Sequence, residues 1–162
     1  MAGKVLMTAG AVLRGDDAVG PYLARLLMDE PVEGWEVIDG QQTPEDDIPV
    51  VRDMAPDFLL LVDAAAMDAA PGTIRVLDKK DVVSDYLMTT HTLPMTYLLD
   101  QLNDYCGSVL FLGIQAGHTD LVAPLTNEVR EAAEKIYGWI KDGEDIPALL
   151  SKNGNEIAPV TV

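Results

Sequence analysis

The chain alternates between short apolar segments and longer segments with helical periodicity. The apolar segments predict five strands, at residues 4–9, 36–39, 58–64, 74–77 and 109–115. Helical periodicity predicts four helices, at residues 19–28, 45–54, 94–105 and 128–141. Strands that alternate with helices in this way are typical of an α/β protein with a mostly parallel sheet.

The segment FLLLVDA, residues 58–64, gives the strongest strand signal. It is apolar at successive positions, so both of its faces are suited to burial. A strand of this kind is typical of the centre of a parallel sheet that helices cover on both sides.

A chain of 162 residues fits one domain with a sizeable core, which we place at residues 1–141. Residues 142–162 mix glycine, proline, asparagine and charged residues with little periodicity. We expect this C-terminal extension to be a short packed turn followed by a mobile tail.

The chain is strongly acidic, with 27 acidic against 11 basic residues and a formal charge of −16. This charge opposes nucleic acids and anionic membrane surfaces, and no apolar run approaches the roughly 20 residues needed to span a bilayer. The single cysteine, Cys106, excludes an internal disulfide framework and is compatible with the cytosol. We therefore expect a soluble, cytoplasmic protein.

Acidic residues follow three of the predicted strands. Asp16 and Asp17 come after the first strand, and Asp39 and Asp63 lie at the ends of the second and third. Because ligands of open α/β sheets bind outside the carboxyl ends of the strands, these side chains are candidates for one site. Clustered carboxylates are unfavourable unless they share a proton or a cation.

Each of these acids also has a structural interpretation. Either Asp16 or Asp17 can cap the following helix, and Asp39, before Gly40, can be a turn residue. Asp63 follows four apolar residues of a central strand, where a carboxylate needs a partner or a cation.

The chain has two histidines, His91 and His118. Each lies in a polar segment and is expected on an exposed loop when considered alone. Together with two converging carboxylates, His91 would complete a mixed oxygen and nitrogen ligand set suited to nickel, zinc or manganese. The residue types alone do not distinguish these metals.

Other chemistries lack their motifs. The segment GAVLRGDD has the glycine spacing of a phosphate-binding loop, but Asp16 and Asp17 stand where a lysine and a hydroxyl residue are required. Neither HExxH nor GxSxG occurs. Cys106 is either a nucleophile paired with His91 or, more simply, a packed residue at a helix end.

Five segments in this order and spacing carry a family resemblance: GAVLRGDDAVGP, VIDGQQTPEDD, LLLVDAAAMD, TTHTLPMTYLLDQL and VLFLGIQ. The chain resembles the NiFe-hydrogenase maturation endopeptidases over about residues 4 to 141. It is most similar to the subgroup that processes the large subunit of the formate-hydrogenlyase hydrogenase.

The resemblance implies a three-layer α/β/α sandwich with a twisted five-stranded sheet. It implies an endopeptidase that removes a C-terminal extension from the NiFe-hydrogenase large-subunit precursor after nickel insertion, by metal-assisted amide hydrolysis. The family's metal-binding positions fall on Asp17, Asp63 and His91, with Asp39 as a supporting acid and Asp16 capping or bracing the loop. The metal is expected to be nickel carried by the substrate, although zinc can occupy such a site.

A second interpretation is a non-catalytic, nickel-binding assembly factor that uses Asp17, Asp63 and His91 to hold the metal centre. A small-molecule-binding α/β domain is a third, which the missing phosphate-loop residues disfavour. In each case we expect a monomer.

Overall fold

The sheet has six strands in the part of the chain that this computed structural model describes, residues 3–83 and 92–159. Its order is β2-β1-β3-β5-β4-β6. The strands are β1 (Lys4–Thr8), β2 (Trp35–Asp39), β3 (Phe58–Ala65), β4 (Ile74–Leu77), β5 (Ser108–Gln115) and β6 (Glu156–Ile157). The first three and β5 are parallel, whereas β4 is antiparallel to β5 and β6. The predicted α/β fold is confirmed, with six strands in place of five.

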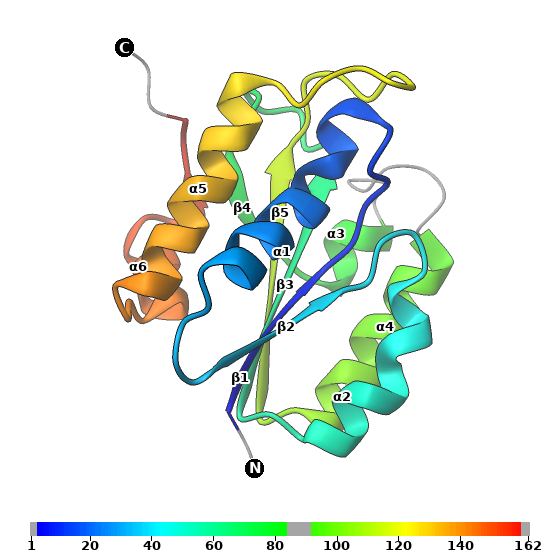
Figure 1. Cartoon of the computed structure of the whole chain (residues 1–162), viewed down its shortest axis with the longest axis vertical. Coiled ribbons are helices and arrows are strands. Elements are labelled where there is room, and N and C mark those ends of the chain that lie inside the picture. The colour runs from blue at the N-terminus through cyan, green and yellow to red at the C-terminus, as the bar shows by residue number, and fades with distance from the viewer. Residues whose placement is uncertain (1–2, 84–91, 160–162) are drawn as a thin grey trace.

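Helices cover both faces of this sheet and complete the three layers of the sandwich (Figure 1). The α-helices are α1 (Val19–Asp29), α2 (Ile48–Met54), α3 (Lys79–Val83), α4 (Thr92–Tyr105), α5 (Asn127–Lys141) and α6 (Ile146–Lys152). Two 3₁₀ helices, η1 (Gly15–Ala18) and η2 (Pro44–Asp47), precede α1 and α2. The predicted helix at 45–54 is thus divided, because Pro49 favours a new helix start at Ile48.

Strand β3 separates two hydrophobic cores. Its residues Leu60 and Val62 pack with α1 and α5, and Leu59 and Leu61 pack with α2 and α4. All four side chains are fully buried. The strand at 58–64 is therefore central and covered on both faces, as its composition predicted.

The strand order reverses at β1. The chain passes from β1 through α1 to β2 on one side, and then through α2, on the other face, to β3 on the opposite side of β1. In open α/β sheets, ligands bind at such a reversal, outside the carboxyl ends of the two adjacent strands, because the connections leave in opposite directions. In this chain that position is at the carboxyl ends of β1 and β3.

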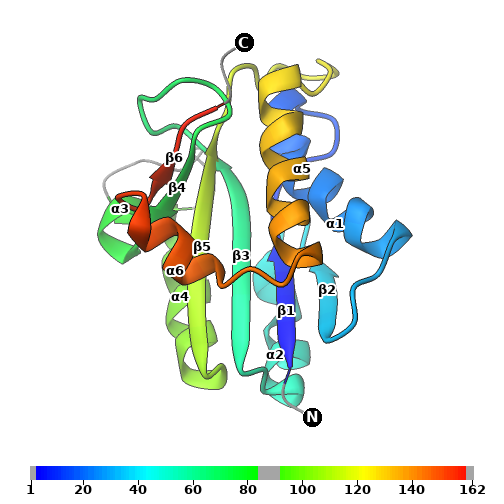
Figure 2. The ribbon, with the colours of Figure 1, turned by 90° about the vertical axis from the view of Figure 1, so that its left-hand side faces the viewer.

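The C-terminal segment differs from the expected tail. Helix α6 buries Ile146 and Leu150 in the core beside α5, and β6 pairs with β4 (Figure 2). The Asp145 carboxylate accepts a hydrogen bond from the Ala148 amide and caps α6. Helix α6 has 7 residues and β6 has 2, so neither is long enough to show a clear period in the sequence. The placing of a domain boundary at residue 141 stays a prediction.

Leu150→Ala tests whether α6 is part of the folded domain. We expect it to lower the free energy of unfolding by about 2–4 kcal/mol, since it leaves a cavity in a shared core. Urea denaturation measures this loss, and the exposed Lys152→Ala is the control on the same helix. A loss below about 0.5 kcal/mol, as for a surface substitution, would show that α6 does not stabilise the domain.

Candidate active site

The acids singled out from the sequence lie at the carboxyl edge of the sheet. Asp17 is in η1, immediately after the loop that follows β1, and Asp63 lies near the end of β3. Asp39 is the last residue of β2 and pairs in register with Thr8 of β1. Because these strands are parallel, their ends meet at one edge, as the sequence predicted.

Asp16 braces the loop and is fully buried. Its carboxylate accepts hydrogen bonds from the backbone amides of Gly117 (2.7 Å), His118 (2.9 Å) and Thr126 (2.7 Å), and from the Thr126 hydroxyl (2.9 Å). It does not cap a helix, because neither η1 nor α1 has a side-chain cap. Asp16 therefore fixes the loop after β1 to the loop after β5.

Asp17 and Asp63 are buried with only part of their hydrogen-bonding capacity used. One oxygen of Asp17 accepts from the Ala11 amide (3.0 Å), and one oxygen of Asp63 accepts from the Ala64 amide (2.8 Å). The second oxygens, Asp17 Oδ1 and Asp63 Oδ2, have no partner among the described residues, nor has the buried Thr8 hydroxyl. A buried carboxylate oxygen without a partner is costly, so this arrangement favours a proton or a cation.

The electrostatics of the pair agree with this geometry. Burial raises the pKa of Asp63 well above its ordinary value, and the negative charge of Asp17 raises it further. The hydrogen bond from the Ala64 amide acts in the opposite direction. Asp17 and Asp63 are thus brought together, although they are 46 positions apart in the sequence.

His91 lies outside the described residues, so the predicted ligand set of Asp17, Asp63 and His91 stays a prediction. Residue 92 begins α4, the helix that packs on the face of the sheet where Leu59 and Leu61 lie. Within residues 3–83 and 92–159, no group of three or more ligating side chains is placed to hold a metal ion.

Asp39 lies beside a pocket of about 460 Å³ on the α1 side of the sheet. Its carboxylate accepts a hydrogen bond from the Gln41 amide (3.3 Å), which is the turn role considered for it. It also lines the pocket, together with Tyr22 and Arg25. The pKa of nearby Asp47 is raised, chiefly by burial and also by the charges of Asp46 and Asp39.

The remaining candidates lie apart from the carboxylate pair. His118 is exposed, as expected, and its backbone amide and carbonyl, rather than its ring, bond to Asp16. Burial raises the pKa of the Cys106 thiol to about 11, and the side chain packs against the α2–α4 core. A thiol with this pKa is a poor nucleophile, so the packing interpretation fits.

Three further residues have buried or bridging polar groups that the sequence did not predict. The Thr8 hydroxyl and Glu45 Oε2 are buried without a partner among the described residues. The Gln115 side chain accepts a hydrogen bond from the Met67 amide (2.6 Å) and thereby holds the segment after Asp63. Thr8 is the last residue of β1, and no feature of the sequence distinguished its hydroxyl from that of an ordinary strand residue.

Comparisons with known proteins agree with this fold. Residues 21–142 match the family model of the hydrogenase maturation protease HycI. The chain is 41% identical to the hydrogenase 3 maturation protease of Escherichia coli K12 over 143 residues, which cover 86% of this chain and 92% of that protein.

Solved structures give the same result. The crystal structure of a hydrogenase 3 maturation protease superposes with a TM-score of 0.82 at 38% identity, covering 99% of this chain and 98% of that one. The solution structure of the endopeptidase HycI from Escherichia coli gives a TM-score of 0.80 at 40% identity, covering 88% of this chain and 90% of that one.

The fold and the matches define a hydrolase of the protease class. The chain belongs to the hydrogenase maturation protease family. Among the described residues, no helix has the length and apolar character needed to cross a membrane.

Asp16→Asn tests the brace between the two loops. The substitution points an amide group at one set of backbone N–H donors, so we expect the free energy of unfolding to fall by about 3 kcal/mol. Thr126→Val removes only the hydroxyl bond and should cost about 1 kcal/mol. Equal effects of the two variants in urea denaturation would contradict the brace.

Asp63→Asn tests the cost of the buried charge in protein kept free of metal by a chelator. Because the folded-state pKa of Asp63 is raised, its ionisation opposes folding, and stability falls as the pH rises from about 4 through that pKa. The variant should be more stable than the unaltered protein at pH 7, and this difference should shrink as the pH is lowered toward about 4.

Urea midpoints at the two pH values measure this effect, with the exposed Asp53→Asn as control. A variant that is less stable than the unaltered protein at pH 7 would show that Asp63 is compensated in the folded state.

Proposed function

We propose that this protein is an endopeptidase that removes the C-terminal extension of a NiFe-hydrogenase large-subunit precursor after nickel insertion. The observation that carries the proposal is the pair of buried carboxylates, Asp17 and Asp63, at the carboxyl ends of β1 and β3, each with one oxygen that has no partner among the described residues. Membership of the protease family supplies the reaction class.

The donor chemistry of the pair fits a divalent metal. Asp17 Oδ1 and Asp63 Oδ2 are available as ligands, because the Ala11 and Ala64 amides hold the other oxygens. Together with His91, the ligand predicted from the sequence, they would form an oxygen and nitrogen set of the kind that nickel or zinc accepts. Nickel belongs to the substrate in this proposal, and a bound divalent metal supplies Lewis-acid polarisation of the scissile carbonyl or of a water molecule.

The carboxylates of the protein itself bind and release protons. In the absence of a cation, the raised pKa of Asp63 favours a proton on the pair, and this proton leaves when the carboxylates act as ligands. Asp39, at the adjacent strand end, is a carboxylate that can accept or return a proton near the cleaved bond. The reaction takes place in the cytoplasm, and the enzyme acts as a monomer.

Intact mass spectrometry of the substrate tests this function. We expect the nickel-loaded large-subunit precursor from the same organism to lose one discrete C-terminal peptide, and the nickel-free precursor to stay unchanged. Asp17→Asn and His91→Ala should reduce the cleavage rate by more than about 100-fold, since each removes a ligand. Asp53→Asn, an exposed acid on α2, should cleave normally.

Two other outcomes decide against parts of this proposal. A stable complex with an unchanged precursor mass would establish the assembly factor in place of the protease. Equal cleavage of nickel-free precursor would show that nickel does not control the reaction.

A further inference from the structure

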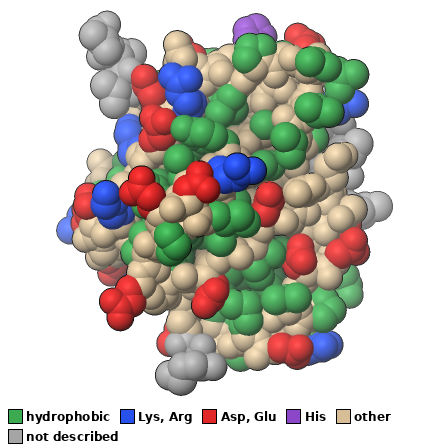
Figure 3. Space-filling view, in the orientation of Figure 1, with side chains coloured by type: hydrophobic (Ala, Val, Ile, Leu, Met, Phe, Trp, Pro, Cys, Tyr) green, Lys and Arg blue, Asp and Glu red, His purple; other side chains and the backbone are tan. Residues whose placement is uncertain are grey.

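Four large hydrophobic side chains are exposed on the two loops beside the site. Val12 (56% exposed) and Leu13 (64%) lie between β1 and η1, and Leu121 (64%) and Val122 (73%) follow β5. We call these four residues the apolar rim. Figure 3 shows hydrophobic side chains gathered at the upper right, where these loops lie in Figure 1. Exposed apolar clusters of this kind mark interaction sites.

The apolar rim is held in one shape by contacts between the loops. The Val122 amide donates to the Leu13 carbonyl (2.6 Å), and the Asp16 amide donates to the His118 carbonyl (2.6 Å). At Gly15 a Cβ atom would lie 2.4 Å from the His118 carbonyl oxygen, so only glycine permits this approach. Since the surface is already formed, a ligand need not order it on binding.

Val122 has an unfavourable backbone conformation for its residue type. Its φ of 65° lies in the left-handed region, which β-branched residues rarely adopt. The side chain is the most exposed of the rim, so core packing does not explain a valine here. Strained residues of this kind cluster at functional sites.

The charge distribution indicates the chemistry of the partner. The chain carries a formal charge of −16, yet residues 10–15 and 116–126 contribute only Arg14 and Asp120 as exposed charged side chains, and these cancel. A polybasic segment finds no local attraction on such a surface. A neutral, apolar surface instead fits an apolar polypeptide segment, because charged residues are depleted at the centres of protein interfaces.

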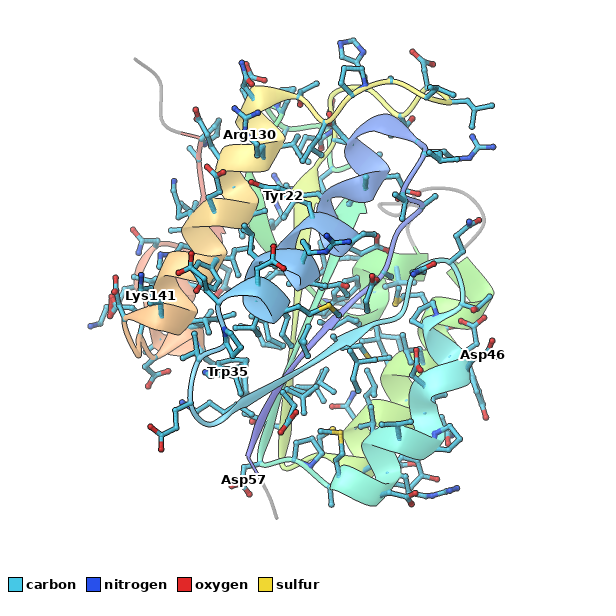
Figure 4. The ribbon with its side chains drawn as sticks, viewed as in Figure 1. Tyr22, Trp35, Asp46, Asp57, Arg130 and Lys141 are labelled. Carbon is cyan, nitrogen blue, oxygen red and sulfur yellow. The ribbon has the colours of Figure 1, made fainter. Side chains whose placement is uncertain are left out.

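The apolar rim continues into the pocket beside Asp39. Val12 belongs to both, and Met28, Tyr22 and Leu125 give the pocket apolar walls. Figure 4 shows Tyr22 between α1 and α5, where its hydroxyl donates to Glu134 (2.8 Å). The surface therefore runs from the exposed loops to the strand end that carries Asp39.

We propose that the apolar rim and this pocket bind an extended, apolar segment of the precursor polypeptide and so position its cleavage site at the carboxylates. This inference rests on the proposed function and adds the recognition surface to it. The occupant is a polypeptide segment of the substrate, because the surface continues into the pocket that Asp39 lines.

Val122→Asn separates binding from folding. Asparagine tolerates a positive φ, so stability should be unchanged or higher, whereas the apolar contact is lost. We expect KM for the nickel-loaded precursor to rise about tenfold with kcat unchanged, and Leu13→Ser with Leu121→Ser to raise it further. Val50→Asn on α2, at a position 47% exposed, is the matched control and should leave both constants unchanged.

The outcomes separate this inference from the proposed function. Cleavage with the same KM in the rim variants and in Val50→Asn would overturn the docking surface and leave the protease intact. If the unaltered protein does not cleave, the dissociation constant of the precursor complex decides the inference, with weakening in the rim variants supporting it and unchanged affinity overturning it. A dimer of the unaltered protein that Val122→Asn converts to a monomer would assign the surface to a second copy.

Discussion

The electrostatic interaction between two buried carboxylates constrains the rest of this site. Asp17 and Asp63 lie where the strand order reverses, and the charge of one raises the pKa of the other. Each carboxylate keeps one oxygen on a backbone amide and leaves the second without a partner in the described part of the chain. Such a pair is unfavourable while both carboxylates are charged, so the fold favours a proton or a cation at this position.

The neighbouring Asp16 shows that the same residue type has another role one position away. Its carboxylate is equally buried but accepts bonds from three backbone amides and a hydroxyl. Full hydrogen bonding compensates its charge, so it needs no cation and acts as a link between loops. Asp17 occupies a fixed position because Asp16 holds the loop that carries it. Counting hydrogen bonds thus separates the structural acid from the candidate ligands.

The fold could be predicted from the sequence wherever a hydrophobic pattern continued over a long enough segment. The segment at 58–64 indicated a central strand, and its parallel pairing with β1 brings Asp17 and Asp63 to the one edge that the sequence indicated. Helix α6 and strand β6 could not be predicted, because they are held by contacts with residues distant in sequence rather than by their own period. The hydrogen-bond partners of Asp16 could not be predicted either. The loop that binds it begins about 100 residues away, and it contributes backbone amides, which have no sequence motif. Thr8 is recognisable as part of the site only from the burial of its hydroxyl without a partner among the described residues.

Strand β3 belongs to both hydrophobic cores and also carries Asp63 of the candidate site. A carboxylate that can turn toward water loses the raised pKa that burial gives it. Asp63 is held in place, because the four residues before it in β3 are fully buried on both faces and fix the end of the strand. The free energy that the two cores contribute therefore offsets the cost of keeping Asp63 buried beside Asp17. A looser core would relieve that cost and release Asp63 from its position, so the tight packing of β3 maintains the carboxylate pair as well as the fold.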